Sequence, residues 1–170
     1  MKALVIVVLA CLLASCAKDQ PLLLETPSGF AEGRFRNDSP YEVSKVLSGL
    51  CVKAKLKVEV SDEHRVVCSM VMEDWDAWLA RFILEGSTEP EQKVEFHISR
   101  QGDGVLVLAN MWIESATPDG RVHREPLKAN HQRNDLQQAL WYAGAVFPGG
   151  NIPCESASCS QGNFGQPPPK

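Results

Sequence analysis

Cysteine and histidine are the side chains of this sequence with the widest scope for chemistry, because they act as nucleophiles, metal ligands and disulfide partners. The chain has six cysteines and four histidines. No cysteine pair shows C-x-x-C spacing and no two histidines are four residues apart, so the spacings typical of zinc sites are missing from the sequence. We therefore expect no metal ion at any histidine: His64, His97, His123 or His131.

Sequence motifs of catalysis and phosphate binding are also missing. There is no G-x-S-x-G elbow, and Gly102-Asp103-Gly104 lacks the glycine spacing of a dinucleotide loop. Glu73, Asp74 and Asp76 form an acidic cluster at an expected helix start, where they complement the helix dipole. We expect a protein without catalytic residues or a bound cofactor, and not an enzyme.

The N-terminus places one cysteine in a specific context. Lys2 precedes the apolar run 3–14, which is shorter than the about 20 residues that cross a bilayer but suits a secretory signal peptide. The junction Leu13-Ala14-Ser15-Cys16 resembles the lipobox of bacterial lipoproteins. The resemblance implies removal of residues 1–15, and a thioether-linked diacylglycerol and an N-acyl chain on Cys16. The alternative is an ordinary secreted protein.

The lipid implies a location for the mature chain. Two or three acyl chains hold a protein on a membrane stably, whereas one chain binds only marginally. Ala17 stands where lipoproteins retained in the inner membrane of enteric bacteria tend to have Asp. The resemblance therefore implies the inner leaflet of the outer membrane, facing the periplasm. A second frame ending at Cys11 leaves a very short apolar run.

Export would place the other four cysteines in an oxidising compartment, where an even number favours disulfides. Of three possible pairings, sequence proximity favours Cys51–Cys68 and Cys154–Cys159. The first would close a loop of roughly 15 residues, worth about 3 kcal/mol. Alternatively, Cys51 and Cys68 are small buried apolar side chains.

Size and charge limit the number of domains and the classes of partner expected for the mature chain. Loss of residues 1–15 would leave 155 residues, enough for one domain with its own core. Loss of Lys2 would leave 16 basic against 21 acidic residues, a formal charge of −5. Nucleic-acid-binding proteins usually carry a clustered basic face, so we expect no nucleic-acid partner.

Patterning divides the mature chain into three parts. Residues 16–27 are expected to form a lipidated tether with an extended reach of about 40 Å. Within it, Leu22-Leu23-Leu24 is apolar enough to pack on the domain or to contact the lipid surface. Residues 28–147 hold the periodic elements of a single domain. Residues 148–170 are rich in Pro and Gly and are expected to be disordered.

Periodicity predicts an α+β two-layer sandwich, in which about three amphipathic helices cover one face of an antiparallel sheet. Pro126 places the last strand at a sheet edge. The expected strands are 29–36, 56–60, 66–72, 94–98, 105–114 and 121–127. The expected helices begin after Ser39-Pro40, near Asp74, and at a cap on Asn134 or Asp135. This element order is loosely similar to helix-grip domains of outer-membrane assembly lipoproteins.

Two polar stretches, 121–125 and 128–134, have no evident structural role. An edge strand can pair with another chain, so Arg121, His123 and Arg124 are the predicted partner surface. Alternatively, these charges only protect a solvated edge. We expect an accessory or scaffold subunit of the cell envelope that acts through protein–protein contacts. The alternative is a lipoprotein that binds or carries a small ligand or a lipid.

The lipid assignment predicts the behaviour of a Cys16→Ser variant. The wild-type chain should sediment with membranes and incorporate labelled palmitate, whereas the variant should do neither, because it lacks the thiol that accepts the lipid. A Cys11→Ser variant is the matched control and should keep both properties. Membrane-bound, labelled Cys16→Ser protein would overturn the assignment.

Overall fold

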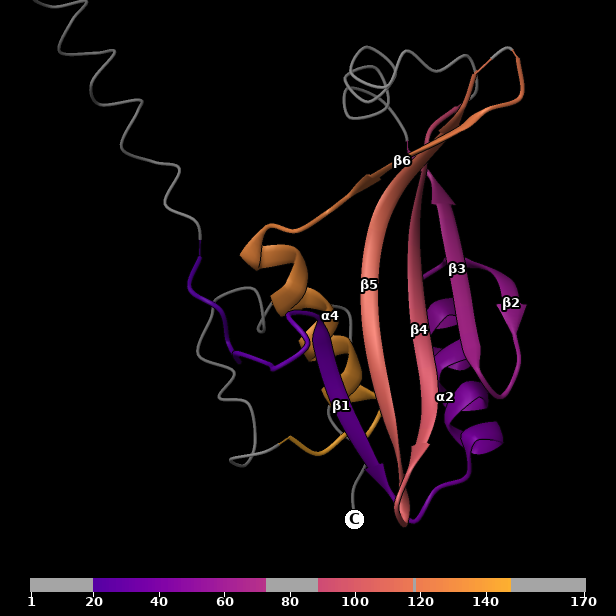
Figure 1. Ribbon diagram of the computed structural model, residues 1–170. Helices are drawn as coiled ribbons and strands as arrows, with labels where there is room; N and C mark the ends of the chain where they lie inside the picture. Colours follow the sequence, from indigo (N-terminus) through magenta and orange to yellow (C-terminus); the bar gives the residue numbers. More distant parts are fainter. Residues whose placement is uncertain (1–19, 73–88, 118, 148–170) are drawn as a thin grey trace, which may run out of the picture.

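The computed structural model describes residues 20–72, 89–117 and 119–147 (Figure 1). The elements in chain order are β1 (Ala31–Arg36), α2 (Pro40–Lys53), β2 (Lys57–Ser61), β3 (Arg65–Val71), β4 (Glu91–Gln101), β5 (Gly104–Ala116), β6 (Val122–Pro126) and α4 (Asn130–Tyr142). The expected helix near Asp74, the acidic cluster beside it, Cys16 and the pair Cys154–Cys159 lie outside the described residues.

The six strands form one antiparallel sheet. Five of them follow the order β1-β5-β4-β3-β2. The sixth strand, β6, pairs antiparallel with the second half of β5, from Trp112 to Ala116. The α+β class and the antiparallel sheet are therefore as predicted. β6 ends at Pro126 and is exposed along its whole length, as an edge strand should be.

The two described helices lie on the same face of the sheet (Figure 1). α2 packs against β2, β3 and β4, and α4 packs against β1 and β5. Successive side chains of a strand point to opposite faces, so alternate positions of each strand meet the helices. The fully buried side chains of this layer are Leu47, Leu140, Val43, Val66, Val105, Val107, Cys51 and Cys68.

Local sequence signals set the start of α2 but not of α4. Glu42 N–H donates to Ser39 Oγ over 3.2 Å, and Ser39 N–H donates to Glu42 Oε2 over 3.2 Å, which is the expected capping box. The expected start of the last helix at Asn134 or Asp135 is wrong, because α4 begins at Asn130. Ala129 N–H donates to the Gln132 side chain over 3.0 Å at that start.

Asn134 lies inside α4 and binds the N-terminal segment. Its side chain is buried, accepts a 2.8 Å hydrogen bond from Leu23 N–H, and donates a 2.9 Å bond to the Pro21 carbonyl. Leu23 and Leu24 pack against the core. Of the two roles left open for the leucine run, the structure shows packing on the domain.

The chain after α4 completes the other edge of β1. Val146 and Arg34 exchange two main-chain hydrogen bonds, of 3.1 and 2.7 Å, and both Ala145 and Phe147 are buried. A Cβ on Gly33 would lie 2.7 Å from Ala145 Cβ, so this strand position needs a residue without a side chain.

Cys51 of α2 and Cys68 of β3 form a disulfide with an S–S distance of 2.08 Å. The prediction for this pair is confirmed. Both residues are also part of the buried core, so the bond links the helix layer to the sheet.

A Cys51→Ala, Cys68→Ala double variant should lose about 3 kcal/mol of unfolding free energy, because the bond closes a loop with a sequence separation of 17. Urea denaturation of both proteins without reductant measures the difference. Wild type unfolded with excess reductant is the control and should approach the variant. Equal denaturation midpoints would show that the bond contributes little.

Candidate functional site

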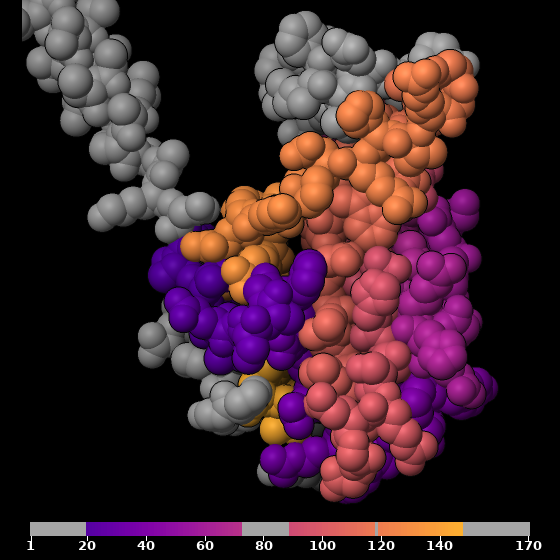
Figure 2. Space-filling model, viewed as in Figure 1, coloured from indigo at the N-terminus to yellow at the C-terminus, as the bar shows by residue number. Residues whose placement is uncertain are grey.

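A pocket opens where β5 changes its partner strand. β1 pairs with β5 as far as Ala109, and β6 pairs with it from Trp112 onward. Asn110 and Met111 lie between these two partners, and Leu127 N–H donates to the Met111 carbonyl over 2.9 Å. A pocket of about 540 Å³ opens at this position, which we call the seam pocket. Figure 2 shows the surface hollowed where the indigo N-terminal segment meets the orange chain and β5.

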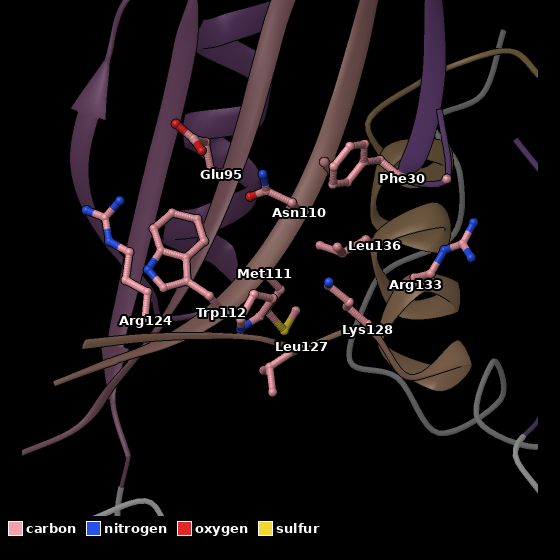
Figure 3. A pocket seen from close by; sticks show the side chains of 13 residues that line it. Phe30, Glu95, Asn110, Met111, Trp112, Arg124, Leu127, Lys128, Arg133 and Leu136 are labelled. Atoms are coloured by element: carbon pink, nitrogen blue, oxygen red, sulfur yellow. The ribbon is translucent and has the colours of Figure 1, made fainter. Parts of the chain in front are cut away.

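The seam pocket has mainly apolar walls. Phe30 comes from the segment before β1, Leu127 from the link between β6 and α4, and Leu136 from α4. Figure 3 shows the Phe30 ring and the Leu136 side chain on the opposite side of Met111 from Trp112. The apolar lining residues are Phe30, Ala109, Met111, Trp112, Pro126, Leu127 and Leu136.

Four polar residues that line the pocket make few hydrogen bonds to the rest of the protein. On the sheet side, Glu95 Oε2 lies 3.1 Å from His97 Nε2, and Asn110 Oδ1 is buried without a hydrogen-bond partner. On the helix side, Lys128 points toward the middle of the pocket (Figure 3), and Arg133 Nε is buried without a partner.

Unsatisfied buried atoms are rare because each costs about 1–3 kcal/mol. Three buried side-chain atoms of the described residues lack a partner, and two of them, on Asn110 and Arg133, belong to residues that line the seam pocket. The third is Ser115 Oγ. Asn110 Oδ1 is the unpaired atom on the sheet side of the pocket, whereas the Arg133 side chain is directed away from the pocket (Figure 3).

Two donors on the sheet side are already engaged. Trp112 Nε1 donates to Glu114 Oε2 over 3.2 Å, and Arg124 Nε donates to the same oxygen over 2.7 Å. The Arg124 guanidinium also lies 5.5 Å from the centre of the Trp112 ring. Arg124 therefore forms a fixed part of the pocket wall.

The three residues of the predicted partner surface are not brought together. Arg121 pairs with Asp119 at 2.9 Å in the turn before β6. His123 lies opposite Ser115 and Arg124 opposite Glu114, so these neighbours point to different faces of the sheet. Only Arg124 of the three lines the seam pocket.

Other pocket residues are not among the predicted site residues. Lys128 and Arg133 belong to the polar stretch 128–134, for which the sequence indicates no role residue by residue. Glu95 and Asn110 occupy the polar side of alternating strands and resemble ordinary solvated positions. No local signal distinguishes them, because only the pairing of β4 with β5 places them side by side.

A cationic centre lies next to the pocket, on the face of the sheet opposite α2 and α4. Lys93 Nζ contacts Glu114 Oε1 at 2.9 Å, Glu59 Oε2 at 3.0 Å and Glu91 Oε2 at 3.5 Å, and its side chain is only 13% exposed. Burial alone would lower the Lys93 pKa. The hydrogen bonds that Lys93 donates to Glu114 and Glu59 outweigh burial and hold this pKa above its ordinary value.

The carboxylates around Lys93 are shifted in the opposite sense. Burial alone would raise the pKa of Glu59 and of Glu114, but hydrogen bonds from Lys93 outweigh it and lower both pKa values. Hydrogen bonds donated by Trp112 and Arg124 lower the Glu114 pKa further. The Lys93 centre therefore fixes the carboxylate that holds the sheet-side wall of the seam pocket.

The described residues contain neither a metal-binding cluster nor a membrane-spanning helix. No group of three or more His, Cys, Asp or Glu in 20–72, 89–117 and 119–147 is arranged to hold a metal ion. None of the helices in this part of the chain is long and apolar enough to cross a membrane.

No protein-family model matches the sequence, and no curated protein matches it with significant similarity.

The Lys93 centre predicts a pH-dependent stability. Carboxyl groups with lowered pKa values stabilise the fold above their ordinary pKa of 4.5, and this stabilisation is lost as the pH falls through the lower folded-state values. A Lys93→Met variant should lose about 1 kcal/mol of unfolding free energy at neutral pH and show a weaker acid dependence. Denaturant titrations between about pH 7 and pH 3 measure both effects.

Lys45→Met is the matched control, because Lys45 is exposed on α2. It should leave the acid dependence unchanged. An identical pH profile for wild type and Lys93→Met would rule out the ion cluster as the source.

Proposed function

We propose that this protein is an envelope lipoprotein, held on the membrane by lipid on Cys16, that acts as an accessory or scaffold subunit. It binds a partner protein at the seam pocket and the adjacent β6. The observation that carries the proposal is the buried, unpaired Oδ1 of Asn110 at the seam pocket, beside the exposed strand β6. A bound partner would supply its hydrogen bond.

The form of this edge supports a polypeptide partner. All five residues of β6 are exposed, and the strand pairs with β5. Strand edges of this kind can bind an extended segment of another chain through main-chain hydrogen bonds. The seam pocket lies at the end of β6, so one partner segment could follow the strand and place a side chain in the pocket.

The N-terminal segment supports a site close to the membrane. Asn134 holds Pro21 and Leu23, so four residues separate the predicted lipidated residue Cys16 from the first held residue. The five Cα–Cα steps from Cys16 to Pro21 reach at most about 18 Å. Gly29 and Phe30, which follow this segment, line the seam pocket. The partner is therefore a protein of the same membrane or one that reaches its periplasmic surface.

A small-ligand or lipid carrier is the second candidate function. Its support is the volume of about 540 Å³ and the mainly apolar lining. Native mass spectrometry of protein extracted in mild detergent distinguishes the two. A stoichiometric small molecule retained by the wild type, and lost on substitution of Met111 by a larger residue, would favour the carrier.

Site-directed photo-crosslinking tests the proposed function. The full chain carries p-benzoylphenylalanine in place of Phe30, which lines the pocket and is 46% exposed. In irradiated native envelopes it should give one adduct of defined mass with a single envelope protein, and that protein should also co-purify in mild detergent. The adduct should weaken in a Lys128→Ala background.

The matched control carries the same photo-reactive residue at Val52, which is 65% exposed on α2 and does not line the seam pocket. It should give no such adduct. Equal adducts at both positions, or none at Phe30, would contradict a partner surface at the seam.

A further inference from the structure

The polar groups that border the seam pocket differ in type from one side to the other. On the sheet side, two acceptors are available to an incoming molecule: the buried, unpaired Asn110 Oδ1, and the Glu95 carboxylate, which lies 3.1 Å from the largely exposed His97. On the helix side, the Lys128 amine points toward the middle of the pocket, whereas the Arg133 side chain is directed away from it (Figure 3). Figure 3 also shows Leu136 between Asn110 and Lys128.

The engaged donors sharpen this division. Trp112 Nε1 and Arg124 Nε, two of the side-chain donors on the sheet side, are both directed at Glu114. Glu114 is in turn held by Lys93 at 2.9 Å. An incoming molecule therefore meets acceptors at the sheet side without having to displace these bonds.

The middle of the pocket requires an apolar group. Leu136 lies between Asn110 and Lys128, and Phe30, Met111 and Leu127 complete the apolar lining. A fully buried side chain of the size of Leu contributes about 1.5–3 kcal/mol in such surroundings. The molecule that fits therefore carries, in order, a hydrogen-bond donor, an apolar body and an anionic acceptor.

We infer that the seam pocket binds a peptide segment that pairs an apolar side chain with a carboxylate, an inference that rests on the proposed function. A main-chain N–H of the segment donates to Asn110 Oδ1. The apolar side chain lies between Met111 and Leu136. The carboxylate accepts a hydrogen bond from Lys128, which is charge-assisted and stronger than a neutral one.

Other ligand classes satisfy only part of the pocket. A fatty acid would fill the apolar middle and bind Lys128, but it has no donor for Asn110 Oδ1, which would stay buried and unpaired. An inorganic phosphate would bind Lys128 but leave the apolar middle empty. A peptide satisfies all three requirements, because every residue other than proline provides a main-chain donor.

The carboxylate has two sources, the C-terminus of the segment or an acidic side chain, and peptide binding distinguishes them. Three fluorescein-labelled pools have randomised residues before a fixed Leu. The first ends in Leu with a free carboxyl group, the second ends in Leu carboxamide, and the third places Glu after Leu and ends in a carboxamide. Anisotropy titrations use the full-length protein in mild detergent.

We expect saturable binding of the first pool, the third pool or both, and about tenfold weaker binding by Lys128→Ala, which loses a charge-assisted bond. Asn110→Leu should weaken the same pools about fivefold. Lys45→Ala is the matched control and should bind like wild type. Circular dichroism melts check each fold, and Lys128→Gln replaces any variant that is unfolded.

Three outcomes overturn the inference. Carboxamide Leu peptides that bind as tightly as the others exclude a carboxylate requirement. Saturable binding of sodium oleate with the same variant sensitivity, and of no peptide pool, assigns the pocket to lipids. Absence of binding by any pool also rejects the peptide chemistry, while an adduct at Phe30 in envelopes would still leave the proposed partner function standing.

Discussion

The length of β5 is the constraint on which the rest of the structure depends. β5 has 13 residues, whereas β1 has six and β6 has five, so one edge of β5 needs two partners to be covered. The two partners arrive from distant parts of the sequence and leave Asn110 and Met111 between them. The seam pocket follows from this mismatch, because no regular main-chain ladder closes that point.

Two buried amides of α4 keep the β1 side of this arrangement in place. Gln137 Nε2 donates to the Glu32 carbonyl over 2.6 Å, and Glu32 N–H donates back to Gln137 Oε1 over 3.2 Å. Asn134, one turn earlier, makes the equivalent pair of bonds to Pro21 and Leu23. The same helix presents Leu136 to the pocket, so it both fixes β1 and forms a wall of the site.

Sequence patterns predicted features that depend on near neighbours. The Ser39 capping box, the alternation in β2 and β4 and the Cys51–Cys68 pair all rest on short separations. Features that depend on distant partners were missed. Asn134 resembles a helix cap, but its partners lie more than 100 residues earlier, and no local pattern shows that.

The site itself was predicted only as a region. The polar stretches 121–125 and 128–134 do border the seam pocket, but their individual roles depend on which face each side chain meets. Arg121 and Arg124 look alike in sequence, yet one pairs within a turn and the other is held by Glu114 over Trp112. Glu95 and Asn110 become recognisable only when β4 and β5 are paired.

The binding of Pro21 and Leu23 by Asn134 has a consequence for affinity. With lipid on Cys16, only four residues would lie between the lipidated residue and Pro21, so the domain would stay within a thin layer above one membrane surface. Short linkages of this kind raise effective concentrations to the millimolar range. A partner in the same membrane would then be occupied even if its segment bound the isolated domain weakly, and release of the segment 20–24 from α4 would dilute the domain into a larger volume.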